Sequence, residues 1–141
     1  MPLIKLIKMI KNIEYNKLIS NFKGFHVRKE KFLKLFTCYN WYEGDKRITH
    51  AGYIRERDCY RSLNYKSWDA LKPVVEKIEK IGFQFDISRK SLINKKEHIC
   101  IIWNDEHTIN VCEIQNTISL IDVIYELVIE FIKWYNELHT N

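Results

Sequence analysis

The chain has 141 residues, 46% of them hydrophobic, with four glycines and two prolines. This length and composition predict one folded domain that buries a core without disulfides or metal, and they exclude a low-complexity chain. No apolar run approaches the ~20 residues that a membrane span needs. Lysines recur at every third position in residues 1–13. This segment therefore lacks the uninterrupted apolar core of a secretion signal, and we expect a cytoplasmic protein.

The net charge of +5 is unevenly distributed along the chain. Residues 1–67 contain 15 Lys and Arg against 6 Asp and Glu, a balance of +9, whereas residues 68–141 contain 8 against 12, a balance of −4. Such an asymmetry predicts an anionic partner for the N-terminal half. AT-rich coding DNA is the competing explanation, because it enriches Lys, Ile, Asn and Tyr without any selection for binding.

Residues 3–20 are predicted to form a helix, because apolar residues recur on one broad face and polar residues such as Lys5 and Asn12 lie opposite. A basic amphipathic helix can lie on a membrane surface. More often such a helix packs on a sheet, and we predict that arrangement with no membrane partner. Since Met9 can also serve as the start, residues 1–8 are a candidate N-terminal extension.

The next segment predicts a hairpin. Residues 31–42 alternate in the manner of a strand, and Glu43-Gly44-Asp45 is a turn signal. Residues 47–54 are predicted to return as the second arm, with a bulge or interruption at Gly52. We expect irregular structure over residues 55–66.

A helix followed by a strand is predicted over residues 67–88. Apolar residues recur at three- and four-residue steps up to Gly82, after which they alternate with polar residues. Ser67 or Asp69 can cap the helix. With Ser67 as the cap, Pro73 falls past the first turn and removes a backbone hydrogen bond, so we expect a start near Asp69 or a kink.

The C-terminal third predicts a hairpin and a long helix. Residues 98–103 and 108–114 are its strands, joined by a turn at 104–107. The last helix is predicted to begin at Thr117 or Ser119, with Asp122 in a capping-box-like position. The chain is thus predicted to be a single α+β sandwich domain, residues 1–141. About three helices cover a mainly antiparallel sheet in the order α–β–β–α–β–β–β–α.

Three segments carry a resemblance to a group of known proteins. The piece from residue 67 to 83, which begins SWDALKPVVEKIE (residues 67–79), resembles a segment with the motif SWDxLxPVVEKIE in small uncharacterised proteins from Bacteroidota phages and prophages. In that group an NKLIxxFxG-like helix precedes the motif and a VVEFIKWYN-like helix closes the chain, which residues 16–24 and 128–136 match. The layout is also similar, more loosely, to the phage ABA-sandwich domain. The resemblance leaves out residues 25–66, and it implies a fold and a phage or mobile-element origin with no established catalytic residue.

The cysteines and histidines raise a zinc hypothesis. Cys38, Cys59, Cys100 and Cys112 form no CxxC pair, and we predict free, mostly buried thiols. Within fifteen residues, four N and S donors could hold zinc: His98, Cys100, His107 and Cys112. Their spacing matches no recognisable zinc motif, so we expect no metal and no cofactor.

Motifs of the common enzyme classes are missing from the sequence. It has no P-loop, dinucleotide fingerprint, nucleophile elbow or zinc-deaminase pattern. Residues 105–107 have acid–base side chains, but in a hairpin turn these are more often solvated. We therefore expect a protein that is not an enzyme.

Residues 25–66 interleave cations with aromatic residues. Cations contact phosphates and rings stack on exposed bases, so this composition suits single-stranded nucleic acid, and Tyr, Trp and Arg also dominate protein–protein contacts. The alternative, without a binding role, is that alternate aromatic residues lie in the core and the cations lie in solvent. The predicted partner-binding residues are Arg47, Arg55, Arg57, Arg61, Trp41, Tyr42, Tyr53 and Tyr60.

The expected function combines this charge pattern with the implied phage origin. We predict an inhibitor of a bacterial defence system, an anti-CRISPR protein that binds a Cas nuclease or its guide RNA in the bacterial cytoplasm. The alternatives are a sponge that sequesters an anionic nucleotide signal and a phage protein that binds nucleic acid generally.

Overall fold

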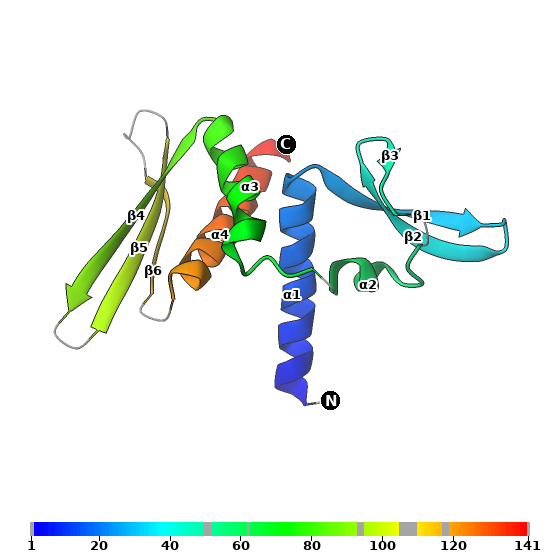
Figure 1. The fold of residues 1–141 in the computed structure, drawn as a ribbon, viewed down its shortest axis with the longest axis horizontal. Coiled ribbons are helices and arrows are strands. Elements are labelled where there is room, and N and C mark those ends of the chain that lie inside the picture. Colours follow the sequence, from blue (N-terminus) through cyan, green and yellow to red (C-terminus); the bar gives the residue numbers. More distant parts are fainter. Residues whose placement is uncertain are drawn as a thin grey trace. The chain divides into compact units, whose positions relative to one another are not determined.

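The computed structural model describes residues 2–49, 52–61, 63–92, 95–104, 110–116 and 119–140 (Figure 1). For residues 89–92, 95–97 and 110–116 only the backbone is described. The chain divides into two compact units, Met1–Asn64 and Tyr65–Asn141. Each unit has a three-stranded antiparallel sheet of its own. That residues 1–141 form a single domain stays a prediction.

The first unit has two described helices and one small sheet, in the order β1-β2-β3. In chain order its elements are α1 (Leu3–Phe22), β1 (Phe25–Phe32), β2 (Phe36–Glu43), β3 (Lys46–Arg47) and α2 (Glu56–Arg61). The helix predicted over residues 3–20 is confirmed. Helix α2 lies in the segment predicted to be irregular, and that part of the prediction is wrong. Its six residues are too few to show a helical period.

The chain reverses between β1 and β2 at Leu33 and Lys34. These residues have φ of +53° and +61°, and the amide of Leu35 donates to the Phe32 carbonyl over 3.1 Å. Because Phe32 pairs with Phe36, the loop consists of Leu33, Lys34 and Leu35. Two consecutive positive φ angles suit the twist of a hairpin and are normally supplied by Asn-Gly. The prediction of one strand over residues 31–42 is therefore wrong. The predicted turn at Gly44 does occur, with φ of +61°, and leads into the short β3.

Helix α1 packs within its unit through a more polar face than expected. Its buried residues are Asn16, Ile19, Ser20 and Phe22, all in the second half of the helix. In the first half the apolar side chains are exposed, Leu3 and Ile4 by about 70%. The face predicted to pack on a sheet is therefore open over residues 3–10.

The second unit is a three-stranded meander with two helices. Its elements are α3 (Trp68–Lys80), β4 (Phe83–Leu92), β5 (Lys95–Asn104), β6 (Asn110–Asn116) and α4 (Leu120–His139). Both hairpins are antiparallel, with Phe83 opposite Asn104 and His98 opposite Asn116. The two helices lie on the same side of the sheet (Figure 1). Of the predicted hairpin turn at 104–107, only Asn104 lies within the described residues.

Two side-chain caps begin the helices of this unit. Ser67 caps α3 by accepting the amide of Ala70 at 3.3 Å, so the helix starts one residue before the predicted Asp69 and tolerates Pro73 in its interior. Ser119 caps α4 by accepting the amide of Asp122 at 3.1 Å and donating to its carboxylate at 2.7 Å. The predicted capping contact at Ser119 is therefore confirmed. Gly82, with φ of +110°, ends α3 as predicted.

A compact apolar core lies beneath α4. Phe131 is fully buried and meets Phe83 edge to face, with ring centroids 4.9 Å apart. Trp134 contacts the same two rings at 5.7 Å. Helix α4 packs on β5 and β6, and α3 packs on β4 and on α4. Buried side chains of the two helices are Leu71, Val74, Val75, Ile78, Val123, Ile124, Tyr125, Leu127, Val128, Ile129, Phe131 and Ile132.

The predicted fold class is confirmed at the level of α+β with antiparallel strands. The element order also agrees, except for the added α2 and the short β3. The single sheet is wrong, because the described strands form two small sheets. The described helices number four, roughly consistent with the prediction of about three. Among the segments that the structure describes, none is a helix with the length and apolar character needed to cross a bilayer.

We predict that Leu127→Ala and Phe131→Ala each lower the free energy of unfolding by about 2–5 kcal/mol, because each removes a fully buried side chain from this core. Leu138→Ala, at a residue 57% exposed near the end of the same helix, is the matched control and should change stability little. Urea unfolding followed by circular dichroism measures all three. A parent-like midpoint for Leu127→Ala would place the core on another face of α4.

Candidate partner-binding surface

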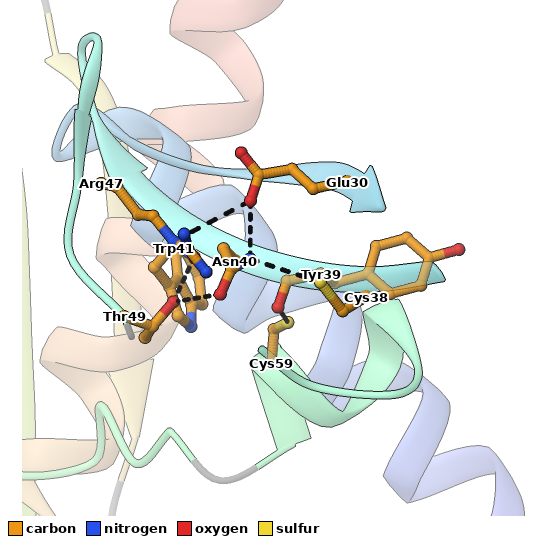
Figure 2. A network of polar contacts seen from close by, with 8 residues as sticks. All are labelled: Glu30, Cys38, Tyr39, Asn40, Trp41, Arg47, Thr49 and Cys59. Carbon is orange, nitrogen blue, oxygen red and sulfur yellow. Dashed lines mark hydrogen bonds and ion pairs between the residues drawn. The ribbon is translucent and has the colours of Figure 1, made fainter. Parts of the chain in front are cut away.

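A buried amide organises the sheet of the first unit. Asn40, fully buried in β2, donates through Nδ2 to Glu30 Oε2 at 2.7 Å and accepts through Oδ1 from the Thr49 hydroxyl at 2.9 Å (Figure 2). Thr49 Oγ1 also accepts the backbone amide of Trp41 at 3.1 Å. The chain after β3 and the side chain from β1 are thus both tied to β2. A buried amide with these partners specifies one arrangement of the strands.

This network also positions Arg47, a predicted site residue. Its Nε lies 3.9 Å from Glu30 Oε2, the same oxygen that accepts from Asn40. Arg47 keeps 42% of its side chain exposed. Part of its charge is therefore compensated by Glu30, and part faces solvent.

Tyr42 is buried, and its ring is occupied by neighbours within the unit. His26 stacks on it, with centroids 5.9 Å apart, and the Arg28 guanidinium lies 4.4 Å from the ring centroid. Arg28 also pairs with Asp45 at 3.0 Å. Because the Arg28 guanidinium covers the face of this ring, Tyr42 acts as part of the packed interior of the unit.

Tyr60 is likewise buried, between α1 and the sheet. Trp41 meets it edge to face at 5.1 Å, and Lys17 Nζ lies 5.9 Å from its centroid. Burial, followed by the negative charge of Glu56 and that of the Cys59 thiolate formed at high pH, raises the pKa of Tyr60 to about 12. Its backbone carbonyl accepts from Asn16 Nδ2 at 2.8 Å, which ties α2 to α1.

The other two predicted aromatics are half-buried. Trp41 packs on Tyr60, as described, and Tyr53 exchanges two backbone hydrogen bonds of 2.8 Å with Tyr39. Gly52, next to it, lies against β2, where an added Cβ would come within 2.9 Å of Cys38 Cβ. The predicted interruption at Gly52 is thus the place where the returning chain crosses close to β2.

Three predicted arginines stand in a different position. Arg55 lies just before α2, and Arg57 and Arg61 lie on it; all three are exposed. Within the described residues no ion pair joins them to a carboxylate. Glu56, the acidic residue between Arg55 and Arg57, is paired with Lys17 at 3.7 Å. We call Arg55, Arg57 and Arg61 the α2 arginines.

The structure therefore places the predicted site residues in different environments. The α2 arginines are open to a partner, whereas Arg47 is already paired with Glu30. Tyr42 and Tyr60 are internal, and Trp41 and Tyr53 are half-buried.

Two asparagines that the sequence did not single out hold this frame. Asn16 joins α1 to the end of α2, and Asn40 joins the strands of the sheet. The sequence signal that could have found Asn40 is a lone amide among aromatic residues in a strand.

Of the four zinc-ligand candidates, the structure describes the side chains of His98 and Cys100. His98 and Cys100 lie two apart on β5, and Cys100 is buried. His107 lies outside the described residues, as does the side chain of Cys112. Among the His, Cys, Asp and Glu whose positions are described, no group of three or more is placed to hold a metal.

The three described cysteines are free, as predicted. Burial raises the pKa of Cys59 to about 11, with Glu56 and Asp58 acting in the same direction and a backbone hydrogen bond opposing them. Burial also raises the pKa of Cys100 to about 11. Neutral thiols at these positions behave as small hydrophobes.

Comparison with known proteins adds no relative. No protein-family model, no curated protein and no solved structure matches the chain. The resemblance carried by residues 67–79 therefore stays a prediction.

We predict that Asn40→Ala lowers the free energy of unfolding by about 1–3 kcal/mol, because it leaves buried partners without their hydrogen bonds. Asn21→Ala, at an exposed asparagine of α1, is the control and should cost less. Asn40→Asp should cost more near neutral pH than in mild acid, because a second carboxylate would then face Glu30. Thermal melting at two pH values measures these effects. Equal destabilisation by Asn40→Asp at both would contradict the contact with Glu30.

We predict that Cys59 and Cys100 resist alkylation by iodoacetamide in the native protein, while the half-buried Cys38 reacts. Both protected thiols have pKa values raised from 9.0 to about 11. Because the folded state favours the neutral thiol, these two groups do not reduce the free energy of unfolding below pH 9, where they are protonated in both states. As the pH rises from about 9 towards 11, the thiols ionise first in the unfolded chain, and the free energy of unfolding declines. Mass spectrometry of peptides after a timed pulse gives the reactivity. Fast labelling of Cys59 without unfolding would show that it is accessible.

Proposed function

We propose that the protein is a phage-encoded or mobile-element-encoded inhibitor of a bacterial defence system, without enzymatic activity. In this proposal it is an anti-CRISPR protein that binds a Cas nuclease or its guide RNA in the bacterial cytoplasm. The phage origin is supported by the resemblance of residues 67–79 to the SWDxLxPVVEKIE motif.

The division of charge between the two units supports an anionic partner for the first. Unit Met1–Asn64 has 14 Lys and Arg against 6 Asp and Glu, a formal charge of +8. Unit Tyr65–Asn141 has 9 against 12, a formal charge of −3. A field of one sign accelerates encounter with an oppositely charged surface, and a loaded guide RNA carries such a surface.

The observation that carries the proposal is the exposure of the α2 arginines without ion-pair partners among the described residues. An arginine presents a planar fork of donors that matches phosphate and carboxylate oxygens. Asn16 holds the backbone at the end of α2 against α1 through the carbonyls of Tyr60 and Leu63, which places Arg61 beside α1. Because Tyr42 and Tyr60 are buried, contact is made by charge more than by ring stacking.

Two competing candidates use the same cations. One is a sponge for an anionic nucleotide signal, and the other is a phage protein that binds nucleic acid generally. Pull-down from defence-competent cells, with and without nuclease treatment, separates the three. Recovery of a defence nuclease after RNA removal supports inhibition. Loss of every partner with a steep salt dependence supports plain nucleic-acid binding, and a nucleotide released on denaturation supports the sponge.

We predict that reversing the α2 arginines to Glu abolishes protection of phage from a CRISPR-armed host while the melting temperature changes little, because these side chains are exposed. Arg47→Gln should weaken protection less, since Glu30 already compensates part of its charge. Lys77→Glu with Lys80→Glu on α3 is the control in the second unit and should leave protection intact. Plaque counts on hosts with and without the CRISPR system measure this. Full protection by the arginine variant, with loss in the α3 variant, would place the interface on the other unit.

A further inference from the structure

A hollow of about 310 Å³ lies in the first unit between α1 and the end of α2. It is lined by Lys5, Lys8, Met9, Asn12, Ile13 and Arg61. Its volume is at the lower end of the range of small-molecule sites, about 300–1,000 Å³. Of the six lining residues, only Arg61 belongs to the predicted site. Lys5 and Lys8 come from the segment that the sequence marked as an extension.

The charges around this hollow are of one sign. Lys5, Lys8 and Arg61 line it together with no carboxylate. All three are exposed, and none has an ion-pair partner in the described part of the chain. Three cations held around one concavity repel one another, and an anion placed among them relieves that repulsion.

The remaining lining residues differ in chemistry. Met9 and Ile13 are half-buried and apolar, one turn apart on α1, and Asn12 offers an amide between them in sequence. A flat apolar group can pack against the Met and Ile side chains, while the amide can form hydrogen bonds with the polar edge of that group. The hollow thus pairs an anion site with an apolar floor, as a nucleotide requires.

The position of Arg61 in this hollow is set by the contact between the helices. Asn16 Nδ2 donates to the carbonyls of Tyr60 and Leu63, at 2.8 and 3.0 Å. Arg61 follows Tyr60 directly and is therefore held beside the preceding turns of α1. Lys17 and Glu56 add an ion pair at the other end of α2.

We propose that this hollow binds one nucleotide, with its phosphate among Lys5, Lys8 and Arg61 and its base over Met9 and Ile13. The inference deepens the proposed function and rests on it, because it assigns the chemistry of the anion that the first unit recognises. A nucleotide within a single strand, such as a guide RNA, and a free nucleotide share this chemistry. The site makes the lysines of residues 1–8 part of the binding surface.

Titration of a fluorescent oligouridylate of about ten nucleotides, long enough for one site, tests the proposal. Lys5→Gln with Lys8→Gln should weaken binding about tenfold or more, because both lysines then cease to form charge-assisted hydrogen bonds with phosphate. The slope of log affinity against log salt should fall by about 0.7 for each phosphate that is no longer neutralised. Lys11→Gln with Lys29→Gln removes the same charge from the same unit at two exposed residues outside the hollow, and should change affinity by a smaller factor.

Uridine monophosphate and inorganic phosphate, used as competitors, identify the source of the nucleotide. Competition by the mononucleotide but not by phosphate supports a free nucleotide, and binding of the oligonucleotide alone supports a strand. If the Lys5 and Lys8 variant and its Lys11 and Lys29 control lose the same amount of oligonucleotide affinity, the proposal that the hollow is the binding site is wrong. Preferential binding of an acidic peptide with the same lysine dependence also overturns it.

The pull-down distinguishes this failure from failure of the proposed function. If the parent protein binds neither oligonucleotide nor mononucleotide yet still retains the defence nuclease after RNA removal, the nucleotide site is wrong and the inhibitor proposal stands. If the Lys5 and Lys8 variant loses nucleotide but the Arg55 and Arg57 variant still protects phage fully, the hollow stands and the proposed interface does not. Circular dichroism of each variant verifies that the fold is kept.

Discussion

The buried amide of Asn40 is the contact on which the first unit depends. Among its described residues, this unit buries few apolar side chains: Ile19, Phe22, Tyr42, Cys59 and Tyr60. A core this small leaves several arrangements of short strands close in energy, so something directional must choose among them. Asn40 favours the observed pairing, because in it Glu30 and Thr49 satisfy the buried amide (Figure 2). Asn16 plays the same part for α2, whose six residues would not remain helical in isolation.

The second unit is stabilised mainly by apolar burial. Its helices bury long apolar stripes, and Phe131, Phe83 and Trp134 interlock through their rings. Non-directional burial is sufficient there because two long helices and three strands supply enough area. The contrast agrees with the proposed division of labour. Cations and polar anchors are concentrated in the unit proposed to meet the partner, and the apolar scaffold in the other.

The accuracy of the sequence predictions follows the same division. Helices over residues 67–81 and from 119 onward were predictable, because their apolar period and the caps at Ser67 and Ser119 are local signals. The reversal at Leu33 and Lys34 was not, since neither residue favours positive φ and the apolar alternation runs through the turn. For the site, the exposure of the α2 arginines was predictable, because charged side chains normally lie in solvent. The burial of Tyr42 and Tyr60 depends on contacts with Arg28 and α1 that lie far away in the sequence.

The reversal at Leu33 has a consequence for which substitutions this hairpin tolerates. A turn of Asn-Gly would itself dictate the pairing of β1 with β2, whereas Leu33 and Lys34 enter the left-handed region at a cost of roughly 1–2 kcal/mol each. The register is instead set by Asn40 and Glu30, several residues from the tip. The side chains of Leu33 and Leu35, 71% and 77% exposed, bury little surface in this unit. The end of the hairpin is therefore the part of this unit where we expect side-chain substitutions to disturb the contacts of Asn40 least.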